Sequence, residues 1–256
     1  MYCCGFQASQ NRVKILPMNP QKSFRPKKLS IEEIKSGCIY VYGDNNTESQ
    51  ICLMNEEFRQ GFEIVKKNKD GNKSVTFWGS ARFPVDNEHY QKALRLSRRL
   101  AGELNCMIAT GGGPGIMEAG NRGAYEMGKP SLGMTINLPT EQFTNQYVTE
   151  EIPFYFFFTR KVLMAYSAEA YLYFPGGFGT LDELFEILTL VQTGKSSRLP
   201  IILVGKKFWE PLDQFIRQAL LTENQTISEG DLELYKILDD EDEIVKMVNN
   251  APMRND

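Results

Sequence analysis

The chain has 256 residues, of which 42% are hydrophobic and 24% are charged. This composition supports a sizeable buried core and excludes a wholly disordered, a collagen-like and a disulfide-scaffold protein. Lys and Arg total 29 against 32 Asp and Glu, a net charge of −3, which argues against a nucleic-acid partner. No apolar run approaches the roughly 18 residues that span a bilayer, so we expect no membrane partner.

The first 36 residues differ in composition from the rest of the chain. They carry seven Lys or Arg and only two Glu, and Pro17, Pro20 and Pro26 interrupt any helix there. This predicts a basic N-terminal arm over residues 1–36, either mobile or lying on the body of the protein. A solvated tail is favoured over an arm that binds polyanions. Residues 37–256 are expected to form a single domain.

Short apolar runs alternate with amphipathic segments along most of the remaining chain. Residues 39–42 could form a strand, and residues 54–67 are expected to form a helix. Further strands are expected at 75–78, 106–109, 132–136, 170–174 and 200–204. Further helices are expected at 89–104, 116–127, 159–167, 180–192, 209–221, 231–238 and 242–249. This alternation predicts an α/β fold with a mostly parallel sheet covered by helices on both faces.

Cysteine and histidine usage bears on location and on metal binding. The five cysteines are odd in number and scattered, which is typical of reduced thiols in a cytoplasmic protein. His89 is the single histidine, and the sequence has no CxxC pair. We therefore expect no metal site.

Two glycine clusters each follow a predicted strand and precede a predicted helix, at 111–115 and 176–179. A helix N-terminus offers unpaired N–H groups, and glycine lets an anion approach them closely. Two such loops favour a phosphate-bearing ligand, whereas the alternative is that the glycines only make tight turns. The G-x-G-x-x-G fingerprint fails because Glu118 stands at its last glycine, and a P-loop fails because Pro130 replaces Ser or Thr.

Charged residues flank the second glycine loop. Asp182 and Glu183 fall in the first turn of the predicted helix, where acids suit the helix dipole, and Glu186 can share a face with Glu183. Arg160 and Lys161 begin a helix, where cations are electrostatically misplaced. They are therefore expected to meet an anion or a carboxylate, with solvated surface groups as the alternative.

The ordered set of motifs resembles the LONELY GUY (LOG) family. Phe174-Pro-Gly-Gly-Phe-Gly-Thr-Leu-Asp-Glu183 carries the family's PGGxGTxxE motif, and the run from Gly111 to Gly123 resembles its first glycine loop. Gly79-Ser-Ala-Arg82 and Thr159-Arg-Lys161 resemble two further elements, so the match runs from about residue 74 to 209. The resemblance implies a Rossmann-like three-layer sandwich that is usually a homodimer, with residues 37–256 as a nucleotide-binding catalytic domain.

The resemblance also implies an activity. LOG proteins hydrolyse the N-glycosidic bond of a nucleoside 5′-monophosphate to free base and ribose 5-phosphate, without a cofactor. The family is often labelled lysine decarboxylase, but the sequence has no recognisable Schiff-base lysine context. The alternative is a non-catalytic nucleotide or molybdenum-cofactor carrier or sensing protein of the same fold. Phe157-Phe158-Thr159 differs from the tripeptide of other LOG branches, so a purine and a cytokinin base both stay open.

Site residues follow from the same resemblance. Arg160 and Glu183 are implied as catalytic, with Glu183 facing the ribose and Arg160 facing the leaving base. The expected phosphate-binding residues are Ser80, Gly112, Gly113, Gly176, Gly177, Gly179 and Thr180. Further substrate-binding candidates are Glu118, Lys161 and Glu186.

Overall fold

The computed structural model describes residues 46–137 and 143–254. The chain divides into two compact units, Met1–Cys52 and Leu53–Asp256. The first unit contributes only the start of helix α2 (Thr47–Lys69) to the described residues. The predicted arm and the predicted strand at 39–42 lie outside the described residues, and the boundary at residue 37 stays a prediction.

The second unit is built on one seven-stranded sheet. Its strand order is β4-β3-β2-β1-β5-β6-β7, and all six pairings are parallel. The strands are β1 (Ser74–Trp78), β2 (Met107–Thr110), β3 (Ser131–Ile136), β4 (Glu150–Phe154), β5 (Ala170–Tyr173), β6 (Ile201–Val204) and β7 (Lys236–Leu238). The chain proceeds from β1 out to β4 and then returns to β5 on the other side of β1. The predicted α/β, Rossmann-like fold is confirmed.

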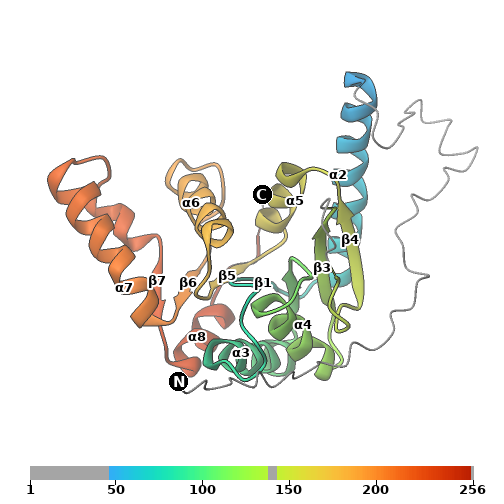
Figure 1. Ribbon diagram of the computed structural model, residues 1–256, viewed down its shortest axis with the longest axis horizontal. Coiled ribbons are helices and arrows are strands. Elements are labelled where there is room, and N and C mark those ends of the chain that lie inside the picture. The colour runs from blue at the N-terminus through green and yellow to red at the C-terminus, as the bar shows by residue number, and fades with distance from the viewer. Residues whose placement is uncertain (1–45, 138–142, 255–256) are drawn as a thin grey trace, which may run out of the picture. The chain divides into compact units, whose positions relative to one another are not determined.

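Helices cover both faces of this sheet and give two separate cores (Figure 1). On one face lie α3 (Glu88–Leu104), α4 (Ile116–Glu126) and α8 (Glu241–Asn249); on the other lie α5 (Phe157–Tyr166), α6 (Phe178–Gln192) and α7 (Lys206–Phe215). Alternation along β1 explains the two cores, because Val75 and Phe77 enter the first whereas Trp78 enters the second. The three-layer sandwich follows from this alternation.

Two local features fix the α3–α4 layer beneath the site. Asn87 caps α3 by accepting a hydrogen bond from the backbone N–H of His89 at 2.9 Å. Gly123 lets α4 approach α3 closely, since a Cβ there would lie 2.4 Å from the Cβ of Ser97. The cap fixes the start of α3, and the close approach at Gly123 packs the second half of α4 against the middle of α3.

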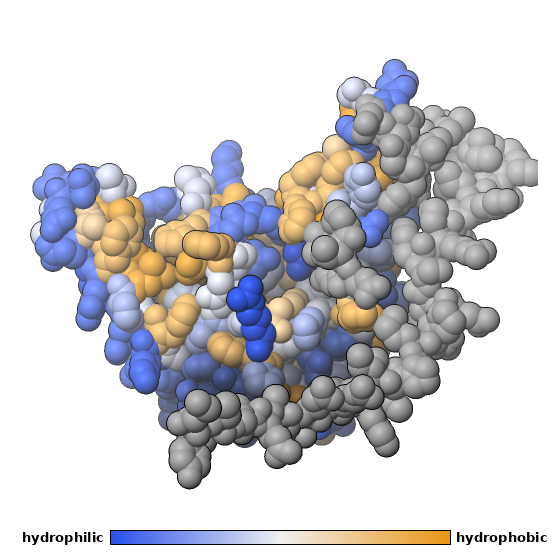
Figure 2. Space-filling model, in the orientation of Figure 1, coloured by the Kyte–Doolittle hydropathy of each residue, from blue (hydrophilic) through white to orange (hydrophobic). Residues whose placement is uncertain are grey.

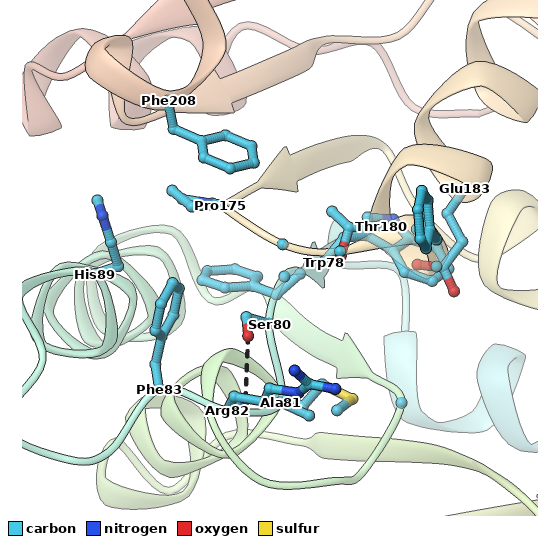
Figure 3. Close-up of a pocket in the computed structure, with 18 of the residues that line it drawn as sticks. Trp78, Ser80, Ala81, Arg82, Phe83, His89, Pro175, Thr180, Glu183 and Phe208 are labelled. Atoms are coloured by element: carbon cyan, nitrogen blue, oxygen red, sulfur yellow. Dashed lines mark hydrogen bonds between the residues drawn. The ribbon is translucent and has the colours of Figure 1, made fainter.

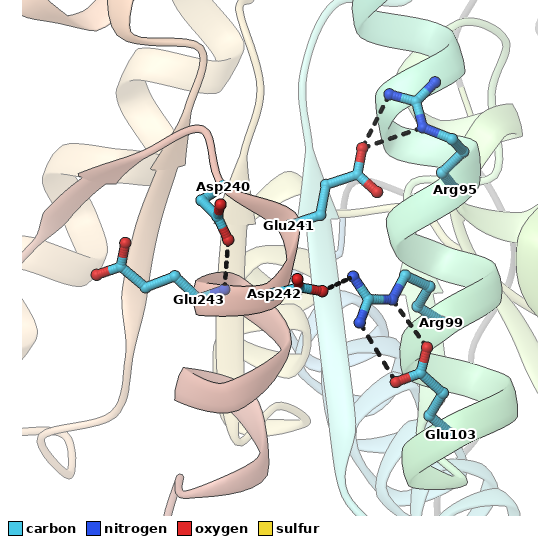
Figure 4. Close-up of polar contacts among 7 residues, drawn as sticks. All are labelled: Arg95, Arg99, Glu103, Asp240, Glu241, Asp242 and Glu243. Carbon is cyan, nitrogen blue, oxygen red and sulfur yellow. Dashed lines mark hydrogen bonds and ion pairs between the residues drawn. The ribbon is translucent and has the colours of Figure 1, made fainter.

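Ion pairs attach the last helix to α3 (Figure 4). Arg95 pairs with Glu241 at 2.8 Å, and Arg99 pairs with Asp242 at 2.7 Å. Asp240 caps α8 by accepting from the backbone N–H of Glu243. Exposed pairs of this kind contribute about 1 kcal/mol or less each, so the buried Ile244 and Val248 supply most of the packing.

Three expectations about the elements are corrected. The helix expected at 231–238 is wrong, because a 3₁₀-helix at Glu229–Glu233 is followed by the edge strand β7. Strand β4 was not expected. The helix expected at 209–221 begins earlier, at Lys206, and continues into a π-helix at Ile216–Glu223.

Cysteine pairing and hydropathy give two further observations. Cys106 is a buried free thiol, and Cys3, Cys4 and Cys38 lie outside the described residues, so the expectation of reduced cysteines stays a prediction. Within residues 46–137 and 143–254, no helix is both long and apolar enough to cross a membrane.

Candidate active site

A cavity of about 880 Å³ opens at the carboxyl ends of β1, β2 and β5. It lies where the strand order reverses, the position at which ligands bind in open α/β sheets. Figure 3 shows the loop after β1 on one side of it and the start of α6 on the other. Seven of the predicted site residues line it: Ser80, Arg160, Gly176, Gly177, Gly179, Thr180 and Glu183.

Arg160 and Glu183 lie next to each other in the lining of this cavity. An Nη1 of Arg160 lies 3.8 Å from Oε1 of Glu183, and the two side chains are only 9% and 15% exposed. Nε of Arg160 donates to the carbonyl oxygen of Met134 at 2.7 Å, which fixes the plane of the guanidinium. The remaining guanidinium N–H groups are therefore directed by a buried backbone contact towards the carboxyl group.

Burial perturbs the charge of both groups. It raises the pKa of Glu183 to about 8, although the charges of Arg160 and Lys161 act in the opposite direction. Burial also lowers the pKa of Arg160, against the stabilising charge of Glu183. A carboxyl group with such a pKa changes its charge near neutral pH, which is typical of residues that take part in chemistry.

The first turn of α6 offers backbone N–H groups to the cavity. Gly177 precedes the helix, and within the described chain no side chain caps it. A Cβ added at Gly177 or Gly179 would meet no atom within 4 Å, so these glycines leave space open beside the helix end. A Cβ at Gly176 would lie 2.2 Å from Oγ1 of Thr180. The loop can therefore admit an anion next to uncapped N–H groups.

The loop after β2 has a different role for each of its glycines. Gly111 lines the cavity, and a Cβ there would lie 2.4 Å from Nη2 of Arg160. Gly112 and Gly113 do not line it. The N–H of Gly112 already donates to Oγ1 of Thr110 at 2.9 Å, so this predicted phosphate donor is engaged within the loop. Gly111 is the glycine that brings the guanidinium into place.

A buried amide network holds this second loop. Nδ2 of Asn145 donates to the carbonyl oxygens of Gly112 and Gly113, each at 3.0 Å. It also donates to Oδ1 of Asn121 at 2.9 Å, and Asn121 accepts from Thr110 at 2.6 Å. The backbone polar groups of the loop are thereby satisfied away from the cavity.

Ser80 joins the loops to one another through its backbone. Its N–H donates to the carbonyl oxygen of Pro175 and its carbonyl oxygen accepts from the N–H of Ile116, both at 3.0 Å. Its hydroxyl accepts from the N–H of Arg82 at 3.1 Å (Figure 3). The hydroxyl hydrogen is left to point at a ligand.

The remaining candidates lie outside the cavity lining. Oε1 of Glu118 accepts from the hydroxyl of Tyr90 at 2.8 Å. Lys161 pairs with Asp182 at 2.7 Å and with Glu186 at 3.2 Å. The cation that was expected to meet an acid does so, but this cluster stabilises the α5–α6 contact beside the site.

Glu57 is a site-supporting residue that the sequence did not reveal. This buried carboxylate on α2 accepts hydrogen bonds from the N–H of Tyr155 and the hydroxyl of Thr159. Tyr155 lies just before α5 (Phe157–Tyr166) and Thr159 lies in its first turn, so Glu57 ties the start of α5 to α2. Burial raises the pKa of Glu57. Since Arg160 follows Thr159 directly, Glu57 anchors the turn that carries the arginine.

Neither a metal cluster nor a dinucleotide loop defines this site. In the part of the chain that the structure describes, no three His, Cys, Asp or Glu side chains are grouped to hold a metal ion. Fold and site define an α/β protein with two glycine loops and a buried Arg–Glu pair at the switch point of its sheet.

Comparison with known proteins identifies the family. The family model described as "Possible lysine decarboxylase" matches residues 117–248, and the chain belongs to this family, the LOG family. The probable cytokinin riboside 5′-monophosphate phosphoribohydrolase LOG6 of Arabidopsis thaliana is 28% identical over 66% of this chain and 83% of its own length. A Rhodococcoides fascians protein named cytokinin riboside 5′-monophosphate phosphoribohydrolase is 28% identical over 57% and 75%. The match covers 62% of the length of LOG2 of Arabidopsis thaliana.

A solved structure shares the fold. The molybdenum cofactor carrier protein of Chlamydomonas reinhardtii superposes with a TM-score of 0.53 over 70% of this chain and 98% of the carrier. Its sequence is 19% identical. A likeness at this identity shows the fold and nothing about the ligand.

Proposed function

We propose that this protein is a phosphoribohydrolase that cleaves the N-glycosidic bond of nucleoside 5′-monophosphates. The products are the free base, a purine or a cytokinin, and ribose 5-phosphate. The observation that carries the proposal is the buried pair of Arg160 and Glu183, 3.8 Å apart, next to the uncapped start of α6. The names of the relatives at about 28% identity support the same reaction.

The substrate phosphate would bind at the first turn of α6. Gly177 and Gly179 leave open space beside the first turn, in which the N–H groups of residues 178–180 are the donors proposed for the phosphate. The positive end of the helix dipole and the Ser80 hydroxyl favour a dianion there. Phosphate binding then positions the ribose, so that remote binding energy lowers the barrier at C1′.

Bond cleavage would use the two buried side chains in opposite roles. Positive charge develops on the ribose as the C1′–N bond breaks, and the ionised carboxylate of Glu183 stabilises it and accepts a proton from the attacking water. Negative charge develops on the leaving base, where the guanidinium of Arg160 stabilises it without giving up its own proton. The hydroxyl group of water joins C1′, and solvent supplies the proton to the base.

A non-catalytic nucleotide or molybdenum-cofactor carrier is the second candidate. One observation favours it: the pKa of Glu183 is about 8, so the free protein at pH 7 holds mainly the neutral acid. A neutral carboxyl group binds a ligand as a hydrogen-bond donor but stabilises a cation poorly.

Adenine release separates these two candidates. We expect the purified protein to release adenine from AMP, and Glu183→Gln to bind AMP but lose most turnover. We expect adenosine to be a much poorer substrate, because it lacks the phosphate anchor. Equal kcat/KM for adenosine and AMP would refute the proposed phosphate site at the start of α6. Full turnover by Glu183→Gln would refute the catalytic role of Glu183.

A homodimer forms part of this proposal. Large apolar side chains stand exposed on the helices around the cavity mouth, with Phe178 at 92% and Phe157 at 56%. Figure 2 shows hydrophobic side chains gathered over α5, α6 and α7. Exposed apolar patches of this kind are typical of protein interfaces.

A further inference from the structure

The cavity has a second end that the proposed hydrolysis does not use. Figure 3 shows Thr180 and Glu183 at one side of the view and His89, Phe83 and Phe208 at the other. All five residues line the same cavity. We call the end bounded by Phe83, His89, Pro175 and Phe208 the aromatic end.

The walls of the aromatic end come from three separate elements. Phe83 belongs to the loop after β1, His89 to the first turn of α3, and Phe208 to the first turn of α7. The rings of Phe83 and His89 lie 5.4 Å apart. Phe208 stands across from them in Figure 3, beyond Pro175, and is 40% exposed.

A backbone constraint brings these walls close together. Gly205 precedes α7 with φ +109°, in the region that favours glycine. A Cβ there would lie 3.4 Å from Cγ of Pro175 and 3.6 Å from Cε1 of His89. The start of α7 therefore packs directly against Pro175 and His89, which gives the aromatic end a fixed base. Aromatic walls around an open space bind flat rings by stacking and by burial of apolar surface.

Positive charge lies between the two ends. Arg82 lines the cavity, and none of the described acidic residues forms an ion pair with it. The uncapped first turn of α6 adds a partial positive charge. Together they supply roughly +1.5 charges, which offsets most of the charge of a dianion such as the diphosphate bridge between two nucleosides. The volume of about 880 Å³ also lies in the upper part of the roughly 300–1,000 Å³ range of small-molecule pockets.

We propose that the aromatic end binds a second aromatic ring that is joined to the nucleotide through a diphosphate. The ligand class of the site is then extended from mononucleotides to dinucleotides. One ribose lies at Glu183, the diphosphate spans the start of α6 and Arg82, and the second ring lies between Phe208 and the Phe83–His89 pair. This assignment rests on the proposed function for the placement of the first ribose and phosphate.

Binding to a non-hydrolysing variant tests the proposal. Isothermal titration of Glu183→Gln with AMP, ADP and P1,P2-di(adenosine-5′) diphosphate compares one phosphate, two phosphates, and two phosphates with a second ring. We expect the dinucleotide to bind at least tenfold more tightly than AMP and several-fold more tightly than ADP. Equal affinities for the dinucleotide and ADP would overturn the proposal that the aromatic end binds a second ring.

A second set of variants locates the effect. Adding Phe208→Ala to Glu183→Gln should reduce the ratio of dinucleotide to AMP affinity at least fivefold, and His89→Ala should act in the same direction. Phe215→Ala is the matched control, because Phe215 lies on α7, is 52% exposed and is absent from the cavity lining. An unchanged ratio in both Phe208→Ala and His89→Ala would refute the assignment.

The two proposals fail in different ways. If the wild-type protein releases no adenine from AMP but the affinity ratios behave as expected, the hydrolase proposal fails. The proposal that the aromatic end binds a second ring then stands. If AMP is hydrolysed but the ratios do not respond to the variants, the aromatic end is wrong and the hydrolase proposal stands.

Discussion

Replacing Glu183 by Gln should stabilise the protein by an amount that grows with pH. In the folded protein burial raises the pKa of this carboxyl group to about 8, from an ordinary value of 4.5. Below pH 4.5 both the folded and the unfolded states carry the proton, and the group costs nothing. Between pH 4.5 and 8 the unfolded state releases the proton and the folded state retains it, so the free energy of unfolding falls as pH rises.

The magnitude follows from the size of this change. One pH unit corresponds to about 1.4 kcal/mol, so the wild-type carboxyl group costs roughly 2 kcal/mol at pH 6 and roughly 4 kcal/mol at pH 8. Glu183→Gln removes a titrating group while keeping its size. Its advantage over the wild type should therefore increase by about 2 kcal/mol between pH 6 and pH 8.

Urea denaturation of both proteins at pH 6, 7 and 8, followed by far-UV circular dichroism, measures this difference. Titrating groups that do not interact with Glu183 contribute equally to the two proteins and cancel in the comparison. Parallel curves of unfolding free energy against pH for the two proteins would refute the conclusion that burial raises the pKa of Glu183.

Two further predictions concern the catalytic pair and its support. If the ionised form of Glu183 is the active one, kcat/KM for AMP should rise about tenfold per pH unit up to about pH 8 and then level off. A rate of adenine release that falls through pH 8 would instead show that Glu183 acts as a proton donor. Glu57→Gln leaves the donors from Tyr155 and Thr159 with one acceptor fewer, so we expect a loss of about 1–3 kcal/mol in stability and a several-fold drop in kcat/KM as Arg160 shifts. Thermal melting and turnover measure both effects, with Glu63→Gln on the same helix, 65% exposed, as the control. Equal behaviour of the two variants would contradict the anchoring role of Glu57.

The interior of the sheet could be predicted from sequence, but its two edges could not. Strands β1, β2, β3, β5 and β6 are mostly apolar and buried at every residue, as expected of parallel strands covered on both faces. Edge strand β4 alternates instead, with Ile152 and Phe154 buried and Glu151 exposed, and it contains Pro153, which edge strands tolerate. Strand β7 is only three residues long, and Leu234 and Leu238 stand four residues apart, a spacing that imitates one face of a helix.

The same distinction applies to the site. Arg160, Glu183 and the two glycine loops stand in local patterns whose order along the chain carries information. The roles of Glu57 and Asn145 depend on hydrogen bonds to backbone groups from distant segments, and a single sequence contains no local signal for such contacts. Glycine counts also cannot show that the N–H of Gly112 is already engaged.

The strand order has a consequence for how the protein emerges from the ribosome. The central strand β1 is made early, yet its partner β5 follows only after three other strands, since Val75 pairs with Ala170. At translation rates of roughly 5–20 residues per second, one edge of β1 stays unpaired for on the order of ten seconds before β5 is synthesised. A nascent chain with an uncovered hydrogen-bonding edge invites chaperone capture or strand exchange between ribosomes. Arg160 and Glu183, which flank β5 in the chain, can come together only once β5 has paired with β1.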